Sequence, residues 1–131
     1  MNGLNTRAVP AWIVGSSGLL AGELARLIEG HGGMQLTGAV SREAGRALRE
    51  MHPQLCSMLE TVDLASAAES LKDQLGAMAP GDEPAVALFL GLPHGHSARA
   101  WFEIAEALGD LAARVAVVDL SADFRIGDVG L

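Results

Sequence analysis

The first segment whose residue types suggest chemistry is a glycine-containing turn, Gly15-Ser16-Ser17-Gly18-Leu19-Leu20-Ala21-Gly22, with the spacing G-x-x-G-x-x-A. Glycine permits a tight turn and a close approach of pyrophosphate, whose charge is met by free N–H groups and the positive end of a following helix. The same glycines could serve only the geometry of a turn. Because the segment follows an apolar run and precedes an amphipathic one, we interpret it as a dinucleotide-binding turn.

A second segment bears on the choice of nucleotide. An NAD site usually has Asp or Glu about 20 residues beyond the glycines, where it binds the ribose 2′-hydroxyl. Here Ser41 and Arg42 follow the apolar run, and the first acidic residue is Glu43. A hydroxyl and a guanidinium suit a 2′-phosphate, which a carboxylate would repel. We therefore predict NADP rather than NAD, the alternative being that Arg42 is a solvated turn residue.

The third segment, 91–97, contains His94 and His96. These histidines could be metal ligands completed by Asp119 or Asp123. However, no third histidine lies near and the H-E-x-x-H spacing is absent, so no metal is expected. We interpret the histidines as hydrogen-bonding groups of the loop, which should face the nicotinamide end of a cofactor cleft. The cofactor-binding residues predicted there are Leu92, Pro93, His94 and Gly95.

Other reactive residue types give weaker signals. Cys56 is the single cysteine, so it cannot form an internal disulfide or the paired spacing of a zinc site. No pattern around it indicates an activated thiol, and we expect a small buried residue. Trp101 and Phe102 are expected in the core. The sequence does not fix the separation of Asp119 and Asp123, so no acid/base pair is assigned.

Strand and helix patterns alternate between these segments. Nearly continuous apolar runs predict buried strands at 9–15, 34–40, 85–90 and 114–120, and 58–62 is an ambiguous short strand. Such alternation predicts an α/β fold, a doubly wound parallel sheet of Rossmann-like type with helices on both faces. Ligands of such sheets bind at the carboxyl ends of the strands, where the polar segments fall.

Helical spacing predicts four helices and their buried faces. The first buries Leu20, Leu24, Leu27 and Ile28, and a short helix covers 46–51. The third covers 64–78, with a capping box from Ser66 to Glu69. The fourth begins at Ser97 as N-cap, and its expected buried face is Ala98, Trp101, Phe102, Ala105 and Leu108.

The size and charge of the chain limit the classes of partner. A length of 131 residues predicts one domain, 1–131. A net charge of −7 should repel nucleic acid and anionic membranes, so a phosphate ligand must be held locally. Arg7 and the apolar stretch after it superficially resemble a secretory signal, but Pro10 and three glycines interrupt the stretch. No apolar run approaches the roughly 18 residues of a membrane span, and we expect a cytoplasmic protein.

Five motifs, taken together and in order, resemble the N-acetyl-gamma-glutamyl-phosphate reductase family. The D-L-S-A-D-F-R run at 119–125 and the L-P-H-G run at 92–95 are the most specific. The other three are the glycine turn with its helix at 15–24, Ser41-Arg42, and H-P-Q-L at 52–55. The resemblance covers about residues 9–127. It implies that the chain is the N-terminal NADP-binding part of a longer two-domain enzyme, with Ser121 joining the cofactor site.

The resemblance also implies a reaction. A cysteine thiolate attacks the acyl phosphate, phosphate leaves, and hydride from NADPH reduces the thioester to N-acetylglutamate semialdehyde in arginine biosynthesis, with a histidine as acid/base. In the family both residues follow D-L-S-A-D-F-R, the cysteine in an N-x-G-C-Y-type motif, and this sequence ends at Leu131 before either. We therefore assign no catalytic residue, do not assign Cys56 that role, and expect the 131-residue chain alone to be inactive.

The resemblance has consequences for assembly, and alternatives stay open. It implies a homo-oligomer for the full-length enzyme. Later chain completes the dinucleotide domain in related two-domain reductases, so this piece is expected to expose apolar helix faces and self-associate. A non-catalytic nucleotide-binding module is one alternative. A segment of a lysine-pathway reductase is another, and the D-L-S-A-D-F-R run argues against an aspartate-semialdehyde dehydrogenase.

Overall fold

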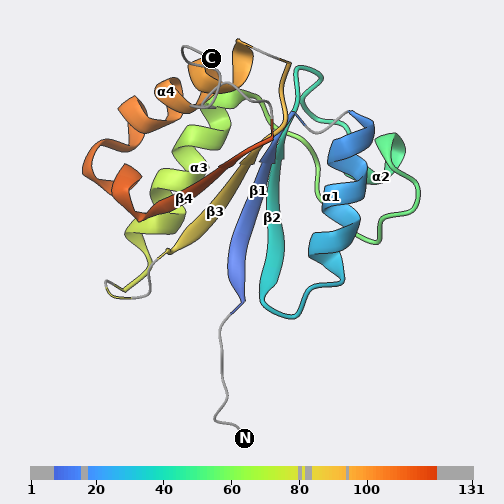
Figure 1. Cartoon of the computed structure of the whole chain (residues 1–131), viewed down its shortest axis with the longest axis horizontal. Coiled ribbons are helices and arrows are strands. Elements are labelled where there is room, and N and C mark those ends of the chain that lie inside the picture. The colour runs from blue at the N-terminus through green and yellow to red at the C-terminus, as the bar shows by residue number, and fades with distance from the viewer. Residues whose placement is uncertain (1–7, 16–17, 80, 82–83, 94, 121–131) are drawn as a thin grey trace, which may run out of the picture.

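Four parallel strands form the centre of the molecule (Figure 1). The computed structural model describes residues 8–15, 18–79, 81, 84–93 and 95–120. The strands are β1 (Val9–Val14), β2 (Met34–Val40), β3 (Val86–Leu90) and β4 (Val115–Asp119), in the spatial order β2-β1-β3-β4. The four predicted strands are confirmed, and so is the parallel, doubly wound sheet.

Helices lie on both faces of this sheet, as predicted. They are α1 (Leu19–Glu29), α2 (Leu48–Met51), α3 (Leu64–Gly76) and α4 (His96–Leu108), followed by a 3₁₀ helix (Gly109–Arg114). The helix α1 packs on one face, and α3 and α4 pack on the other (Figure 1). The chain adds β2 on one side of β1 and then β3 on the other side. The switch point in strand order therefore lies between the carboxyl ends of β1 and β3.

Alternating side chains of β1 supply both halves of the core. Trp12 and Val14 pack with α3 and α4, whereas Ala11 and Ile13 pack with α1. This division follows from the two-residue period of a strand. The Trp12 ring lies so close to the backbone of Gly38 on β2 that a Cβ there would collide with it, and the indole N–H donates to Gln74 Oε1 at 3.1 Å.

The predicted buried faces of α1 and α4 are confirmed at Ile28 and Leu108, whereas their other members are half-buried or exposed. The helix α1 buries Ala21, Gly22, Ala25 and Ile28, while Leu20 and Leu27 are exposed. The helix α4 buries Ser97, Ala100, Ile104 and Leu108. Trp101 is half-buried and packs against the core, whereas Phe102 is exposed, which corrects its assignment to the core. In α1, which packs on β1 and β2, small residues occupy most of the contact surface, because they let the helix approach the sheet closely.

Two helix caps also differ from the prediction. Asp63, rather than Ser66, caps α3, and its Oδ1 accepts the Ser66 N–H at 2.8 Å. Gly95 precedes α4 in a left-handed conformation (φ +89°), and Ser97 lies inside the helix. The ambiguous stretch 58–62 makes two isolated bridges, Val40 to Val62 and Ala47 to Glu60.

The loop around Cys56 is exposed, which corrects the expectation of a buried cysteine. The Glu29 carboxylate at the end of α1 accepts the Cys56 N–H at 3.1 Å and the Ser57 N–H at 2.7 Å. These bonds hold the loop at the surface of α1. The residue of this loop that packs in the core is Leu55, which directly precedes Cys56 and is buried.

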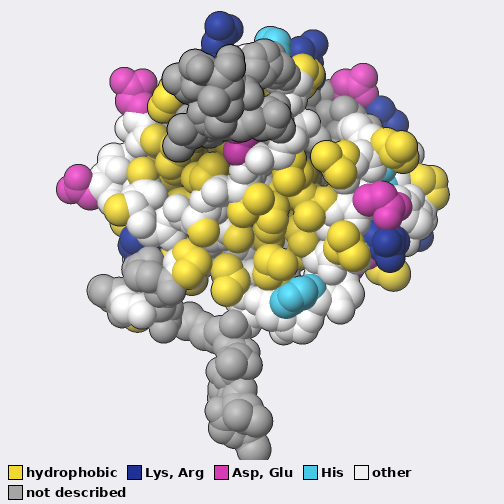
Figure 2. Space-filling model, viewed as in Figure 1, with side chains coloured by type: hydrophobic (Ala, Val, Ile, Leu, Met, Phe, Trp, Pro, Cys, Tyr) yellow, Lys and Arg dark blue, Asp and Glu magenta, His cyan; other side chains and the backbone are white. Residues whose placement is uncertain are grey.

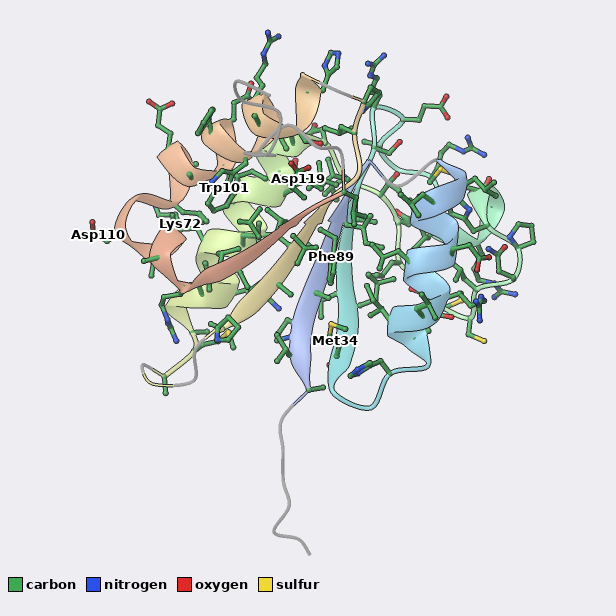
Figure 3. The ribbon with its side chains drawn as sticks, viewed as in Figure 1. Met34, Lys72, Phe89, Trp101, Asp110 and Asp119 are labelled. Atoms are coloured by element: carbon green, nitrogen blue, oxygen red, sulfur yellow. The ribbon has the colours of Figure 1, made fainter. Side chains whose placement is uncertain are left out.

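The sheet face that carries α1 is only partly covered by the described helices. The helix contacts β1 and β2. Hydrophobic side chains gather over the sheet in the space-filling view (Figure 2). Met34 and Phe89, labelled in Figure 3, belong to this half-buried apolar face, and Val118 on β4 is 38% exposed.

Candidate functional site

A cleft of about 730 Å³ lies at the carboxyl ends of β1, β2 and β3. Five of the predicted cofactor-binding residues line it: Gly15, Ser41, Arg42, Leu92 and Pro93. The chain segments that carry them are far apart in sequence. The parallel sheet brings them together, because the carboxyl ends of its strands meet at one edge.

Gly15 stands at the switch point and joins three strand ends. Its φ of +89° is a conformation that favours glycine, and a Cβ there would lie 2.9 Å from Leu92 Cδ2 and 3.0 Å from the Gly91 carbonyl oxygen. Its N–H donates to the Val40 carbonyl at 3.0 Å, and the Gly91 N–H donates to the Val14 carbonyl at 2.9 Å. Glycine is required here by the backbone and by the close approach of the β3 loop.

Gly18 has a different environment from Gly15. It precedes α1 with ordinary extended angles, and a Cβ added to it would meet nothing within 4 Å. Among the described residues no side chain caps this end of α1, and the first turn of the helix has no acidic residue. Space beside a helix N-terminus without an acidic residue suits an anion such as pyrophosphate. Protein packing therefore does not explain the glycine at this position, whereas close approach of a ligand would.

Several predicted residues do not line the cleft. Leu19 and Leu20 are 86% and 58% exposed at the start of α1, and neither they nor Gly18 and Gly95 contribute to its lining. The remaining predicted residues, Ser16, Ser17, His94 and Ser121, lie outside the described residues.

The end of β2 presents two side chains suited to a phosphate. Ser41 is buried, and its Oγ accepts the Glu43 N–H at 3.1 Å, which leaves the hydroxyl proton available for donation. Arg42 is exposed on the cleft, and within the part of the chain that the structure describes it forms no ion pair. A guanidinium in this state can bind an anion without first breaking a contact.

The loop after β3 is fixed by Ser97 from inside α4. The Ser97 side chain is fully buried, accepts the Leu92 N–H at 3.2 Å and donates to the Leu92 carbonyl at 3.4 Å. The His96 N–H donates to the Pro93 carbonyl at 2.9 Å, and His96 also lines the cleft. The loop thus has a defined position at the end of the cleft away from Arg42.

Sequence reasoning missed several charged residues of the cleft. Arg46, Asp63, Arg99 and Glu103 line it from the β2 loop, the cap of α3 and the first turns of α4. The usable signal was position, since the first turns of helices after strand ends face the same edge as the strand ends. A hydrogen bond to Glu43 raises the pKa of Arg46 above its usual value. The Ser66 N–H lowers the pKa of Asp63.

Two features are absent from the residues that the structure describes. Among them, no group of three or more His, Cys, Asp or Glu side chains is placed to hold a metal ion. None of the helices there has the length and apolar character needed to cross a membrane.

Comparison with known families identifies the family of the chain. The sequence model described as "Semialdehyde dehydrogenase, NAD binding domain" matches residues 11–130. The chain belongs to this family. The resemblance indicated by the motifs is thereby confirmed, and a nicotinamide dinucleotide is the cofactor class of the family.

Curated relatives of this semialdehyde dehydrogenase NAD-binding domain are reductases of acyl phosphates. N-acetyl-gamma-glutamyl-phosphate reductase of Salinispora arenicola is 37% identical over 117 residues, covering 88% of this chain and 29% of the relative. The Streptomyces coelicolor enzyme of the same name is 38% identical over 94% of this chain and 31% of its own. An Aeropyrum pernix protein named as a LysW-L-2-aminoadipate/LysW-L-glutamate phosphate reductase is 36% identical over 95% and 31%.

The chain therefore spans about 29 to 31% of the length of these relatives. Its residues fit a nicotinamide dinucleotide. The space beside Gly18 and the uncapped start of α1 suit the pyrophosphate, and Arg42 offers a cation at the β2 end.

Proposed function

We propose that this chain is the NADP-binding part of an acyl-phosphate reductase that forms N-acetylglutamate semialdehyde from N-acetylglutamyl phosphate and NADPH, in arginine biosynthesis. The observation that carries the proposal is the cleft at the switch point, lined by Gly15, Ser41–Arg42 and Leu92–Pro93. Bound NADPH would supply the hydride for the reduction. The residues of this chain bind and orient the cofactor.

Each part of the cofactor has a proposed place along this edge. The pyrophosphate lies at the start of α1, against Gly18 and the predicted residues Ser16, Ser17, Leu19 and Leu20. The 2′-phosphate meets Ser41 and Arg42. The nicotinamide lies toward Leu92–Pro93, with His94, Gly95 and Ser121 assigned to the same end. The loop position fixed by Ser97 supports this direction, because it gives the nicotinamide end a defined wall.

The reacting cysteine and histidine are assigned to parts of the reductase beyond this segment. The relatives are about three times as long as the matched region, which leaves room for a second domain. Cys56 lies in an exposed loop and does not line the cleft. The chain alone is therefore a binding domain with no acyl-phosphate reductase activity of its own.

A second candidate differs only in the acyl group. The Aeropyrum pernix relative, named for LysW-linked substrates, is as similar to this chain as the N-acetylglutamyl-phosphate enzymes are. A reductase of LysW-linked acyl phosphates would use the same cofactor edge. Residues that contact the acyl group would separate the two substrates, and those are assigned to the rest of the enzyme.

A paired titration with NADPH and NADH, followed by nicotinamide fluorescence, tests the cofactor assignment. Tighter binding of NADPH is expected. Arg42→Ala should weaken NADPH about tenfold to a hundredfold and change NADH little, because a charge-assisted hydrogen bond contributes about 1.5–3 kcal/mol. Arg49→Ala is the matched control, since Arg49 is exposed on α2 and does not line the cleft.

Two results would count against the proposal. Equal affinity of the wild-type chain for both nucleotides would overturn the selection of NADP. Failure of a folded chain to bind either nucleotide would overturn the assignment of a complete cofactor site to this segment.

A further inference from the structure

An acidic side chain stands at the end of the cleft proposed for the 2′-phosphate. Glu43 lines the cleft next to Arg42, and its side chain is 66% exposed. A carboxylate near a ribose 2′ position accepts a hydrogen bond from the hydroxyl of NAD and repels the phosphate of NADP. The proposed preference for NADP therefore requires that the charge of Glu43 be offset.

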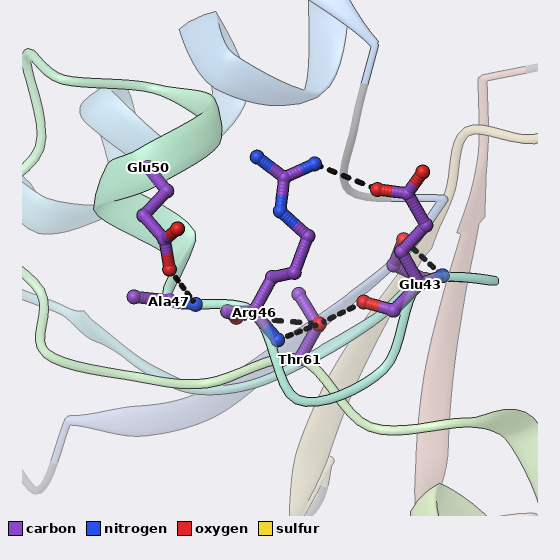
Figure 4. Close-up of polar contacts among 6 residues, drawn as sticks. Glu43, Arg46, Ala47, Glu50 and Thr61 are labelled. Atoms are coloured by element: carbon purple, nitrogen blue, oxygen red, sulfur yellow. Dashed lines mark hydrogen bonds and ion pairs between the residues drawn. The ribbon is translucent and has the colours of Figure 1, made fainter.

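Arg46 lies where it can offset that charge. Its Nη1 is 2.6 Å from Glu43 Oε1, and Arg46 also lines the cleft (Figure 4). The neighbouring carboxylate of Glu50 accepts the N–H of Ala47 at 3.0 Å, so it occupies a different position on the loop. The short contact and the charges make Glu43 and Arg46 an ion pair at the wall of the cleft.

The backbone holds both members of the pair in place. Buried Thr61 donates from Oγ1 to the Glu43 carbonyl at 2.9 Å, and its N–H donates to the Arg46 carbonyl at 2.8 Å. On the other side of Glu43, its N–H donates to Ser41 Oγ at 3.1 Å. The Gly45 N–H donates to the Thr61 carbonyl at 2.7 Å. The loop that carries the pair is thus tied to a buried residue (Figure 4).

We propose that Arg46 determines the preference for NADP by pairing with Glu43, so that Arg42 meets the 2′-phosphate without an opposing carboxylate. The inference rests on the proposed function. In this arrangement Arg42 contacts the phosphate, and Arg46 acts through Glu43 as a positioning residue. Loss of Arg46 leaves the Glu43 carboxylate free to repel the phosphate of NADPH and to accept the 2′-hydroxyl of NADH.

The test is the ratio of the NADH and NADPH dissociation constants for the full 131-residue chain and four variants. Arg46→Ala should lower the preference for NADPH about fivefold to tenfold, a modest effect because the pair is exposed and screened by salt. Glu43→Gln should raise the preference. The double variant Glu43→Gln/Arg46→Ala should return close to the wild-type ratio, since it contains neither the carboxylate nor its partner.

The double variant distinguishes the proposed role from a direct phosphate contact. If Arg46 contacts the phosphate itself, the double variant stays as weak for NADPH as Arg46→Ala, and the proposal is overturned. Arg46→Lys retains the positive charge and should keep most of the preference. A purely structural role would alter both affinities together and leave the ratio unchanged, which would also overturn it.

The proposed function and this inference fail in different ways. A wild-type chain that binds neither nucleotide removes the cofactor assignment and the inference with it. A wild-type chain that prefers NADPH, with an unchanged preference in Arg46→Ala, removes only the inference. Raising the salt concentration should shrink the difference between Arg46→Ala and wild type if the effect is electrostatic.

Discussion

One glycine sets the distance between α1 and the loop after α2. A Cβ added at Gly22 would lie 2.8 Å from His52 Cε1 and closer still to Nδ1. His52 is buried and follows directly after α2, so its ring has little freedom to move. We expect Gly22→Ala to lower the free energy of unfolding by about 1–3 kcal/mol through overpacking, as measured by urea denaturation.

The matched control is Gly76→Ala at the end of α3. No atom lies within 4 Å of a Cβ built there, and its φ is not positive. This substitution should be neutral or raise the free energy of unfolding by up to about 1 kcal/mol, because alanine restricts the unfolded chain. Equal stability of the two variants would show that His52 yields to the added methyl group.

Single residues of the cleft were predictable where they follow strands. Gly15, Ser41 and Arg42 stand at strand ends, and a parallel sheet must bring such positions to one edge. Arg99 stands in the first turn of α4 and could have been found by the same rule, whereas Arg46 could not. The contribution of Arg46 depends on how the loop after β2 turns toward the cleft, and no local spacing records that.

Whole elements were predicted more reliably than the faces they bury. The strands stand out because long apolar runs indicate burial on both faces. For α1, the leucines suggested one face, yet Ala21, Gly22 and Ala25 form the contact. Hydrophobic periodicity gives large residues more weight than small ones, whereas close packing of a helix on a sheet favours small ones. On α4 the buried small residues Ser97 and Ala100 lie on a helix that packs chiefly on α3, and the Ser97 side chain bonds the Leu92 backbone.

The cap of α3 makes its stability depend on pH. Asp63 Oδ1 accepts the Ser66 N–H, and this bond lowers the pKa of the carboxyl group below its usual value of 3.8. Because the pKa of Asp63 is lower in the folded than in the unfolded chain, the ionised carboxylate stabilises the folded state at every pH above the usual pKa of an aspartate. This contribution is lost as the pH falls through the lowered pKa. We expect Asp63→Asn to have a lower melting temperature than wild type at pH 6.

The difference between the two proteins should disappear in acid. Asparagine keeps a side-chain oxygen acceptor for the Ser66 N–H but carries no charge that titrates. Melting curves of wild type and Asp63→Asn, recorded in steps from pH 6 downward, should therefore coincide only once the pH has fallen through the lowered pKa of Asp63. A constant difference at every pH would show that the charge of Asp63 adds nothing beyond its hydrogen bond.

At the scale of the whole molecule, the strand order explains why one sheet face stays partly open. The helix α1 follows β1 and covers β1 and β2, while α3 and α4 both pack on the opposite face. Within the described residues, β4 pairs only with β3 and is the edge of the sheet. Half-buried Phe89, labelled in Figure 3, and exposed Val118, its register partner on β4, belong to the part of this face beyond α1.

We expect the isolated chain to self-associate through this apolar sheet face, because contiguous exposed apolar surface and an unpaired edge strand favour contacts between copies. Sedimentation velocity should show a rise in sedimentation coefficient with concentration. Val118→Lys should weaken association at least about tenfold, since burying an unpaired charge costs more than about 1.4 kcal/mol.

The control is Phe102→Lys, at an exposed position of α4 on the opposite side of the sheet, which should leave the self-association unchanged. Equal association of both variants would place the contact elsewhere, and a monomer at every concentration would mean that the open face is too small to hold a second copy.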